Sequence, residues 1–338
     1  MSKAKCSCHK LFLLFFSLLW LFGCKPAHPP PAPDPVRLQL KWFHQAQFAG
    51  FYLAQEKGHY ARENLKVTFL EGGPEVDLSG RVMEGRADFA VLSPDDFLLR
   101  RSDGAPLKAL AAIYRRSAVV FVARADSGIE KPADFLGRTV AARNEGGARE
   151  FHIQLLAMLH RLGLNADRVK LTSYDPAYTD FLAGRVDITP CYSTGGLIRL
   201  RKQGLKLNLI RPDDYGIHFY SDILITHERL ISEKPDLVRR FLRASLKGWQ
   251  EAIEDYPQGV QAALKYAKLK DPAFQTAMME AMLPLVHTGE DRIGWMRPET
   301  WLGMAETLSR QGLIKKPFDV NQAYTLRFLK EIYGEQPR

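Results

Sequence analysis

Short apolar runs of strand length alternate with amphipathic stretches along the first two thirds of the chain. Stretches with the apolar spacing of a helix, at about 47–60, 77–85 and 94–103, separate the first four runs. This alternation is typical of α/β proteins with parallel sheets. A long helix is predicted at 148–162. The predicted strands form two sets, and therefore two lobes, at 36–42, 66–70, 87–92 and 107–114, and then at 118–125, 139–143, 169–173, 186–190 and 207–210.

From Glu233 onward the pattern becomes wholly helical. Leu237, Phe241 and Trp249 fall on one face of a predicted helix, which indicates core packing, while the intervening arginines face solvent. Further helices are predicted at 257–269, 272–286, 297–311 and 319–333. We therefore expect a first lobe over 36–115, a second lobe over 116–226, and a return to the first lobe with C-terminal helices over 227–338.

The N-terminus has the layout of a bacterial lipoprotein signal. An apolar run at 11–22 follows three lysines and leads to Leu-Phe-Gly-Cys, ending at Cys24. The run is shorter than the roughly 20 residues that span a membrane, and its flank is that of an export signal. We expect removal of residues 1–23 and acylation of Cys24. Because the phenylalanine two positions before the cysteine is larger than usual, cleavage near Ala27 or Ala32 is the alternative.

Residues 24–35 are rich in proline, which fixes φ and removes amide donors, so they are predicted to form an extended tether. Loss of residues 1–23 removes three lysines and no acid, and lowers the formal charge from +9 to +6. This charge is not gathered into the dense Lys/Arg clusters that nucleic-acid binding needs. Cys191 is the single cysteine after Cys24, so an intrachain disulfide is excluded and Cys191 is expected to be a small buried residue.

No catalytic or metal-binding signature stands out. The usual nucleophile-elbow, phosphate-loop and zinc motifs are absent after the signal, and His152 and His160 do not share one face of their helix. Polar and aromatic residues instead follow several predicted strands, where ligands bind in open α/β sheets. These stretches are 42–48, 71–73, 93–96, 144–147 and 191–194.

Three motifs carry a resemblance to a known family: Gln-Leu-Lys-Trp-Phe-His-Gln-Ala-Gln-Phe-Ala-Gly-Phe-Tyr-Leu-Ala at 39–54, Glu-Lys-Gly-His-Tyr at 56–60, and Gly-Arg-Ala-Asp-Phe at 85–89. The chain resembles the thiamine-pyrimidine-precursor branch of periplasmic solute-binding proteins from about residue 37 to 250. The resemblance implies an α/β fold of the two-lobed type II periplasmic-binding-protein class, with two crossings between the lobes and a helical C-terminal segment. It also implies closure on a small molecule.

The same family contains a pyrimidine synthase that binds pyridoxal phosphate on a lysine and consumes one of its own histidines. The corresponding stretch here, 87–97, has neither residue, and 217–221 lacks the cysteine of the synthase's iron-associated segment. We therefore expect no enzyme activity and no cofactor. The Asn-Glu-Pro that transport-type relatives place near 192–194 is also absent, which leaves the exact ligand open.

The sequence thus predicts a monomeric, lipid-anchored binding protein on the periplasmic side of the bacterial envelope. Its partners would be a pyrimidine-like ligand and the permease and ATPase of an ABC importer, with no nucleic acid. A pyrimidine synthase and a sensory lipoprotein are the alternatives. Aromatic candidates could stack on the ligand or pack in the core, and Gly146 could admit an anion or form a turn. The candidate ligand-binding residues are Trp42, Gln45, Phe48, Tyr52, Ser93, Asp95, Asn144, Glu145, Gly146, Tyr192, Ser193 and Tyr220.

Overall fold

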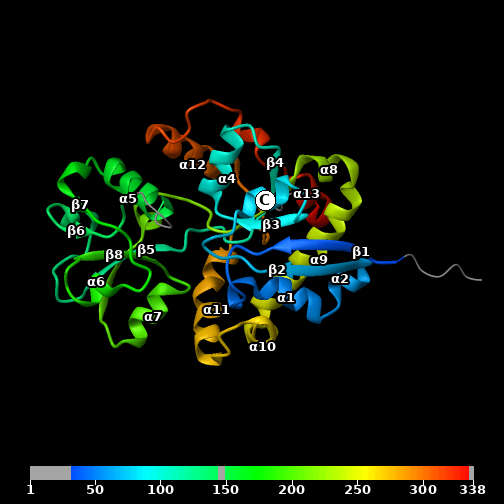
Figure 1. Cartoon of the computed structure of the whole chain (residues 1–338), viewed down its shortest axis with the longest axis horizontal. Coiled ribbons are helices and arrows are strands. Elements are labelled where there is room, and N and C mark those ends of the chain that lie inside the picture. The colour runs from blue at the N-terminus through cyan, green and yellow to red at the C-terminus, as the bar shows by residue number, and fades with distance from the viewer. Residues whose placement is uncertain (1–31, 144–148, 335–338) are drawn as a thin grey trace, which may run out of the picture. The chain divides into compact units, whose positions relative to one another are not determined.

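A computed structural model describes residues 32–143 and 149–334 of the chain. Within this part, the strands form two five-stranded sheets, ordered β2-β1-β3-β10-β4 and β7-β6-β8-β5-β9 (Figure 1). The first sheet contains β1 (Asp34–Gln39), β2 (Leu65–Leu70), β3 (Phe89–Leu92), β4 (Leu107–Ala112) and β10 (Ile223–His227). The second contains β5 (Val119–Arg124), β6 (Thr139–Val140), β7 (Lys170–Leu171), β8 (Ile188–Tyr192) and β9 (Leu207–Ile210). The two predicted sheets are confirmed.

The helices follow the same division of the chain. With the first sheet, as the first lobe, we group α1 (Ala49–Glu56), α2 (His59–Arg62), α3 (Leu78–Met83), α4 (Pro94–Ser102), α8 (Glu228–Glu233), α9 (Pro235–Glu254), α10 (Tyr256–Tyr266), α11 (Pro272–Val286), α12 (Pro298–Arg310) and α13 (Arg327–Tyr333). The second lobe has α5 (Arg149–Arg161), α6 (Thr179–Leu182) and α7 (Gly196–Lys202). In the described ranges, no helix combines the length and the apolar character that crossing a membrane requires.

Both sheets are mixed rather than purely parallel. β1 runs parallel to β2 and β3, but β10 lies antiparallel between β3 and β4. In the second sheet β5 is antiparallel to β8 and β9. β5 and β10 are the strands that the chain forms directly after it crosses from one lobe to the other. Each therefore enters its sheet from the side of the other lobe and runs against its neighbours.

Three sequence-based boundaries were wrong. The second lobe was predicted to extend to residue 226, but β10 pairs with β3 and β4, so the chain has already returned to the first lobe at residue 223. The tether was predicted to end at residue 35, whereas Asp34 and Pro35 pair with β2 at the beginning of β1, where proline is tolerated. The helix predicted at 319–333 is replaced by a short 3-10 turn and α13.

Helix α9 packs closely against α1 because two glycines face one another. A Cβ on Gly248 would lie 2.3 Å from the carbonyl oxygen of Gly50, and a Cβ on Gly50 would lie 2.2 Å from the ring of Trp249. The predicted apolar stripe of α9 is confirmed, since Phe241 and Trp249 are fully buried. This contact fixes α1, and thereby the loop between β1 and α1 that contributes residues to the site described next.

Candidate functional site

Two crossings connect the lobes and are hydrogen-bonded to each other. One runs from β4 to β5 and the other from β9 to β10. The amides of Ile113 and Tyr114 donate to the carbonyl oxygen of Asp222, at 2.8 and 3.1 Å, and the amide of Ser221 donates to the carbonyl of Tyr114 at 3.0 Å. The two crossings predicted from the family resemblance are therefore present. They place the side chain of Asp222 between the carboxyl end of β1 and the second lobe.

Lys41 follows β1 and points toward the crossings. Its Nζ donates to Oδ1 of Asp222 at 3.1 Å and to the carbonyl of Ser221 at 3.2 Å. The other carboxylate oxygen of Asp222 accepts from Nε2 of Gln47 at 2.7 Å. Burial acts to lower the pKa of Lys41, but the charges of Asp222 and Glu150 outweigh it and raise the pKa above the ordinary lysine value. Lys41 is thus a fixed ammonium ion at neutral pH.

The second lobe contributes Glu150 and Tyr192 to the same place. Glu150 lies in the first turn of α5 and is 6 % exposed. Its Oε2 accepts from the hydroxyl of Tyr192, at the end of β8, at 2.8 Å, and Nζ of Lys41 lies 5.7 Å from the centre of the Tyr192 ring. Gln154 donates to Glu150 at 3.4 Å and accepts from Ser117 at 2.9 Å, which ties the glutamate to the first crossing. Burial raises the pKa of Glu150, against the attraction of Lys41.

Asp95 completes the cluster from the first turn of α4. It is 2 % exposed, and its Oδ1 has no hydrogen-bond partner among the described residues. Burial, followed by the charges of Asp96 and Glu150, raises the pKa of Asp95 to about 7, and Lys41 opposes this shift. The neighbouring Asp96 is exposed and pairs with Arg149 of the second lobe at 3.0 Å. The first turns of α4 and α5 therefore face each other across the two lobes.

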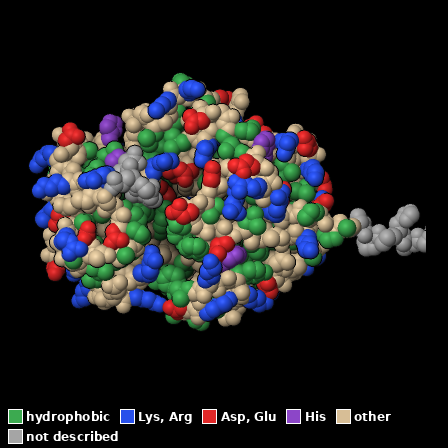
Figure 2. All heavy atoms as spheres, in the orientation of Figure 1, with side chains coloured by type: hydrophobic (Ala, Val, Ile, Leu, Met, Phe, Trp, Pro, Cys, Tyr) green, Lys and Arg blue, Asp and Glu red, His purple; other side chains and the backbone are tan. Residues whose placement is uncertain are grey.

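We call Lys41, Asp95, Glu150, Tyr192 and Asp222 the interlobe cluster. It contains three buried carboxyl groups, and of the described Lys and Arg side chains only Lys41 forms an ion pair with any of them. Figure 2 shows acidic side chains gathered at a hollow near the centre of the displayed face. A buried carboxylate oxygen without a partner is costly unless a donor reaches it. The cluster is therefore suited to accept N–H or O–H groups from a ligand.

The structure brings several predicted residues to this cluster. Asp95 and Tyr192 belong to it, and Ser93, buried before α4, donates to Asp96 at 3.1 Å. Ser193 is half-buried, and its amide donates to the carbonyl of Ala118 at 2.8 Å beside the first crossing. Gln45 is half-buried and donates to Gln47, the partner of Asp222, at 2.7 Å. All of these follow strands or crossings, as the sequence analysis expected.

Three aromatic candidates lie in the core instead. Phe48 and Tyr52 are buried, and Tyr52 stacks on Tyr266 with ring centres 4.4 Å apart. Tyr220 is also buried, with its ring edge against Trp301, and its hydroxyl accepts from the amide of Arg297 at 2.7 Å. Their rings and hydroxyls are used in packing the first lobe, so the prediction that they face the ligand is corrected.

Trp42 differs from these three because it is 40 % exposed and contacts Phe43 edge-on, with ring centres 5.3 Å apart. Its stacking on a ligand stays a prediction. Asn144, Glu145 and Gly146, like Cys24, lie outside the described residues. Cys191 is fully buried, as expected. Among the described residues, no group of His, Cys, Asp and Glu is arranged to hold a metal ion.

Sequence reasoning missed Lys41, Glu150 and Asp222. Each had a weak signal: Lys41 is a charged residue at the end of an apolar strand, and Glu150 follows the Gly-Gly stretch that was singled out before α5. Asp222 precedes an apolar run, 223–225, that was not recognised as part of a strand. Which of these charges meet depends on the crossings, and no local pattern shows that.

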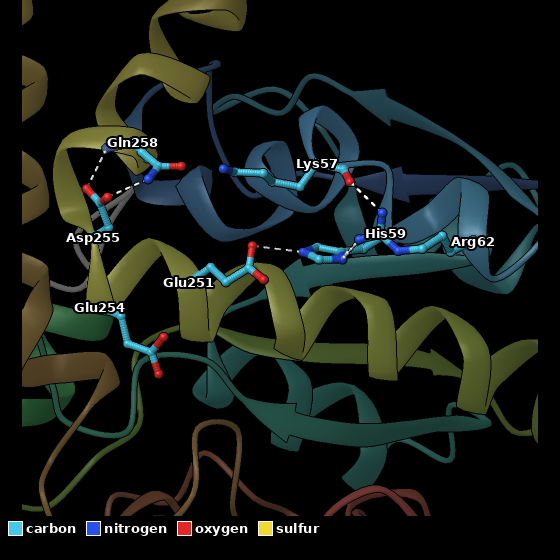
Figure 3. Close-up of a pocket in the computed structure, with 7 residues that line it drawn as sticks. All are labelled: Lys57, His59, Arg62, Glu251, Glu254, Asp255 and Gln258. Atoms are coloured by element: carbon cyan, nitrogen blue, oxygen red, sulfur yellow. Dashed lines mark hydrogen bonds and ion pairs between the residues drawn. The ribbon is translucent and has the colours of Figure 1, made fainter.

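A separate surface pocket lies in the first lobe, between α1–α2 and α9–α10 (Figure 3). In this pocket Glu251 points toward His59, with 2.9 Å between the carboxylate and the ring nitrogen. The lining is charged and largely exposed, and none of it comes from the second lobe. Lobe closure cannot enclose a ligand there, so the interlobe cluster is the stronger candidate. The lining residues are Lys57, His59, Arg62, Glu251, Glu254, Asp255 and Gln258.

Several known proteins match this chain over most of its length. The chain is 27% identical over 323 residues to the riboflavin-binding protein RibY of Chloroflexus aurantiacus, covering 90% of this chain and 89% of the relative. It is 24% identical to the formylaminopyrimidine-binding protein of Halalkalibacterium halodurans, covering 94% and 98%. A relative from Legionella pneumophila, 23% identical with 88% and 92% covered, is named 4-amino-5-hydroxymethyl-2-methylpyrimidine phosphate synthase.

Among solved structures, the periplasmic aliphatic sulphonate binding protein SsuA of Escherichia coli superposes with a TM-score of 0.70 at 16% identity, covering 86% of this chain and 92% of SsuA. At this identity the likeness concerns the fold. A family model described as NMT1/THI5 like matches residues 45–259, more than half of the chain. The chain therefore belongs to the NMT1/THI5-like family and has the fold of the periplasmic solute-binding proteins.

Proposed function

We propose that this protein is the extracytoplasmic solute-binding component of an ABC importer and that it captures a small nitrogen heteroaromatic of the thiamine pyrimidine precursor type. The observation that carries the proposal is the interlobe cluster, to which both lobes contribute side chains and where a buried Asp95 oxygen has no hydrogen-bond partner among the described residues. Ligands of two-lobed proteins stabilise the closed state through contacts with both lobes. Trp42 and Tyr192, from different lobes, would offer ring faces.

The chemistry of the cluster favours an aminopyrimidine over a flavin. An aminopyrimidine presents amine N–H donors to carboxylates, whereas the flavin ring has one N–H donor flanked by two carbonyl oxygens, which are acceptors and are repelled by carboxylates. The name of the formylaminopyrimidine-binding relative supports this choice. Riboflavin is the second candidate, because the chain is 27% identical to a protein named for binding it.

The positions and charge state of the lysines argue against an enzymatic role. The stretch that corresponds to the synthase's lysine and histidine, 87–97, contains neither residue. Lys41 belongs to the interlobe cluster, but it is held as an ammonium by Asp222, and a Schiff base needs a neutral amine. The relatives with synthase names therefore share sequence similarity with this chain, while the lysine that the family resemblance implies for the synthase has no counterpart in this stretch.

Ligand binding is tested by melting the purified, ligand-free protein with 4-amino-5-hydroxymethyl-2-methylpyrimidine, its formylamino analogue and riboflavin. A ligand at 100 times its dissociation constant stabilises the fold by about 2.7 kcal/mol. Trp42→Ala should weaken binding by about 1–3 kcal/mol in calorimetry, because one stacking face is lost. Phe43→Ala is the matched control, since Phe43 is adjacent and 42 % exposed.

Two outcomes would count against the proposal. If no heteroaromatic raises the melting temperature, the ligand class is wrong. If Trp42→Ala and Phe43→Ala have equal effects on affinity, Trp42 is not a stacking residue.

We further propose that Cys24 is acylated and anchors the protein to the membrane on the periplasmic side, where it would meet the permease and ATPase. The proposal rests on the export signal that precedes Cys24. Labelled fatty acid should be incorporated into the wild-type protein and not into Cys24→Ser, which should leave the membrane fraction. A wild-type protein that is exported but unlabelled would contradict acylation.

A further inference from the structure

We propose that the interlobe cluster selects ligands that carry a positive charge, with Asp95 as the carboxylate that receives the cationic group and Glu150 as the group that closes over it. This inference rests on the proposed function and specifies the charge of the ligand. It begins from an imbalance: in the part of the chain that the structure describes, three buried carboxyl groups have one ammonium as an ion-pair partner, that of Lys41. Lys41 is already engaged with Asp222 and Ser221, so its charge is largely committed.

The second observation is the unpartnered oxygen of Asp95. Among the described residues, the groups that interact with Asp95 are Lys41 after β1, Ser93 and Asp96 beside it, Glu150 at the start of α5 and Tyr192 at the end of β8. Among them only Lys41 is cationic, while Asp96 is neutralised by Arg149 at the surface. A ligand ammonium or protonated ring nitrogen is the group that would give Asp95 both a hydrogen bond and a counter-charge. Charge-assisted hydrogen bonds are about twice as strong as neutral ones.

The excess of carboxyl groups opposes lobe closure, because these groups come from both lobes. Asp95, Asp222 and Lys41 belong to the first lobe and its crossing, whereas Glu150 and Tyr192 belong to the second. Closure therefore moves the negative charge of Glu150 toward that of Asp95, and like charges in a poorly solvated site repel. A cationic ligand removes this repulsion, and a neutral ligand of the same shape does not. The differential stabilisation of the closed state is what selects the ligand.

The test compares two pyrimidines of nearly equal shape, the neutral 4-amino-5-hydroxymethyl-2-methylpyrimidine and its 5-aminomethyl analogue, whose side-chain amine is protonated at pH 7.5. Dissociation constants of both are measured by calorimetry on the full chain. We expect the wild type to bind the aminomethyl compound at least about tenfold more tightly, which corresponds to about 1.4 kcal/mol. Asp95→Asn should reduce this preference to about twofold or less. Asp103→Asn, at the exposed end of the same helix, should leave it unchanged.

The outcomes separate this inference from the proposed function. If the wild type binds the neutral pyrimidine as well as the cationic one, the inference is overturned and the proposed function stands. If neither pyrimidine binds, both are overturned for this ligand class. If the preference is present but survives in Asp95→Asn, the assignment to Asp95 is wrong. The wild-type comparison requires no variant, so it decides the charge preference even if Asp95→Asn does not fold.

Discussion

At the scale of single residues, the interlobe cluster shows how burial and nearby charges together determine whether a side chain is ionised. Lys41 is largely buried, yet its pKa is raised, because the charges of Asp222 and Glu150 favour the ammonium form and Asp222 accepts a hydrogen bond from it at 3.1 Å. Asp95 is more deeply buried and forms no ion pair with a described residue, so burial raises its pKa to about 7. Buried carboxyl groups of this kind weaken the fold when they ionise, which is acceptable where a ligand restores the loss.

The pKa of Asp95 predicts how ligand-free stability depends on pH. Because the folded pKa of about 7 lies above the ordinary value of 3.8, the folded state binds more protons between these values. The contribution of Asp95 to the free energy of unfolding should therefore fall as pH rises from about 4 to 7 and stay low above 7. Asp95→Asn should stabilise the ligand-free protein by about 1–3 kcal/mol at pH 8 and have little effect at pH 4.5.

The predicted pH dependence is checked by scanning calorimetry at pH 4.5 and pH 8. Wild type, Asp95→Asn and the surface control Asp103→Asn are compared. Lys41 does not disturb the comparison, since its raised pKa keeps it charged at both. A stabilisation by Asp95→Asn that is the same at pH 4.5 and pH 8 would show that Asp95 does not titrate in this range.

At the scale of elements, the apolar period located most strands and helices because it depends on neighbours along the chain. It failed for β10, whose place depends on a crossing between the lobes. It also failed to separate core aromatics from site aromatics at the end of β1. Phe48 and Tyr52 are four residues apart, on the face that the β1–α1 connection and α1 bury, so helical spacing was an available signal for core packing.

The candidate site was predicted only in part for a related reason. Residues such as Asp95 and Tyr192 follow strands, and the rule that ligands bind at strand ends finds them. Lys41, Glu150 and Asp222 matter because their charges meet, and they are separated by 109 and 72 positions along the chain. A single charged residue beside an apolar run has many ordinary explanations. That Lys41, Glu150 and Asp222 lie close together can be seen only in the folded structure of both lobes.

At the scale of the whole molecule, surface contacts hold the lobes together away from the cluster. Lys202 of α7 pairs with Asp271, just before α11, at 2.8 Å, and its Nζ lies 5.6 Å from the centre of the Phe274 ring. Near α12, Nε2 of Gln311 donates to the carbonyl of Ile153 in α5 at 2.9 Å. These contacts join elements of different lobes without touching the interlobe cluster. We therefore expect them to act on an equilibrium between open and closed forms rather than on ligand contacts.

Removal of the Lys202 contact should weaken ligand binding indirectly. Both partners are partly exposed, with side-chain exposures of 49% and 35%, so the ion pair contributes about 0.2–1 kcal/mol and is screened by salt. Lys202→Met should lower the population of the closed form and raise the dissociation constant by about 1.5- to 5-fold at low salt, with a smaller effect at 0.5 M salt. Calorimetry at the two salt concentrations measures this, and small-angle scattering of the ligand-free protein should show a larger radius of gyration.

Lys206→Met is the matched control, because Lys206 is exposed four residues further on and forms no ion pair among the described residues. It removes the same charge from the second lobe, so it reproduces any general effect of net charge on the attraction of a cationic ligand. If Lys206→Met raises the dissociation constant as much as Lys202→Met, the effect is long-range electrostatics and the Lys202–Asp271 contact has no part in closure. If only Lys202→Met does so, and its effect falls with salt, closure depends on contacts outside the ligand site, and ligand affinity can be changed without altering any residue that touches the ligand.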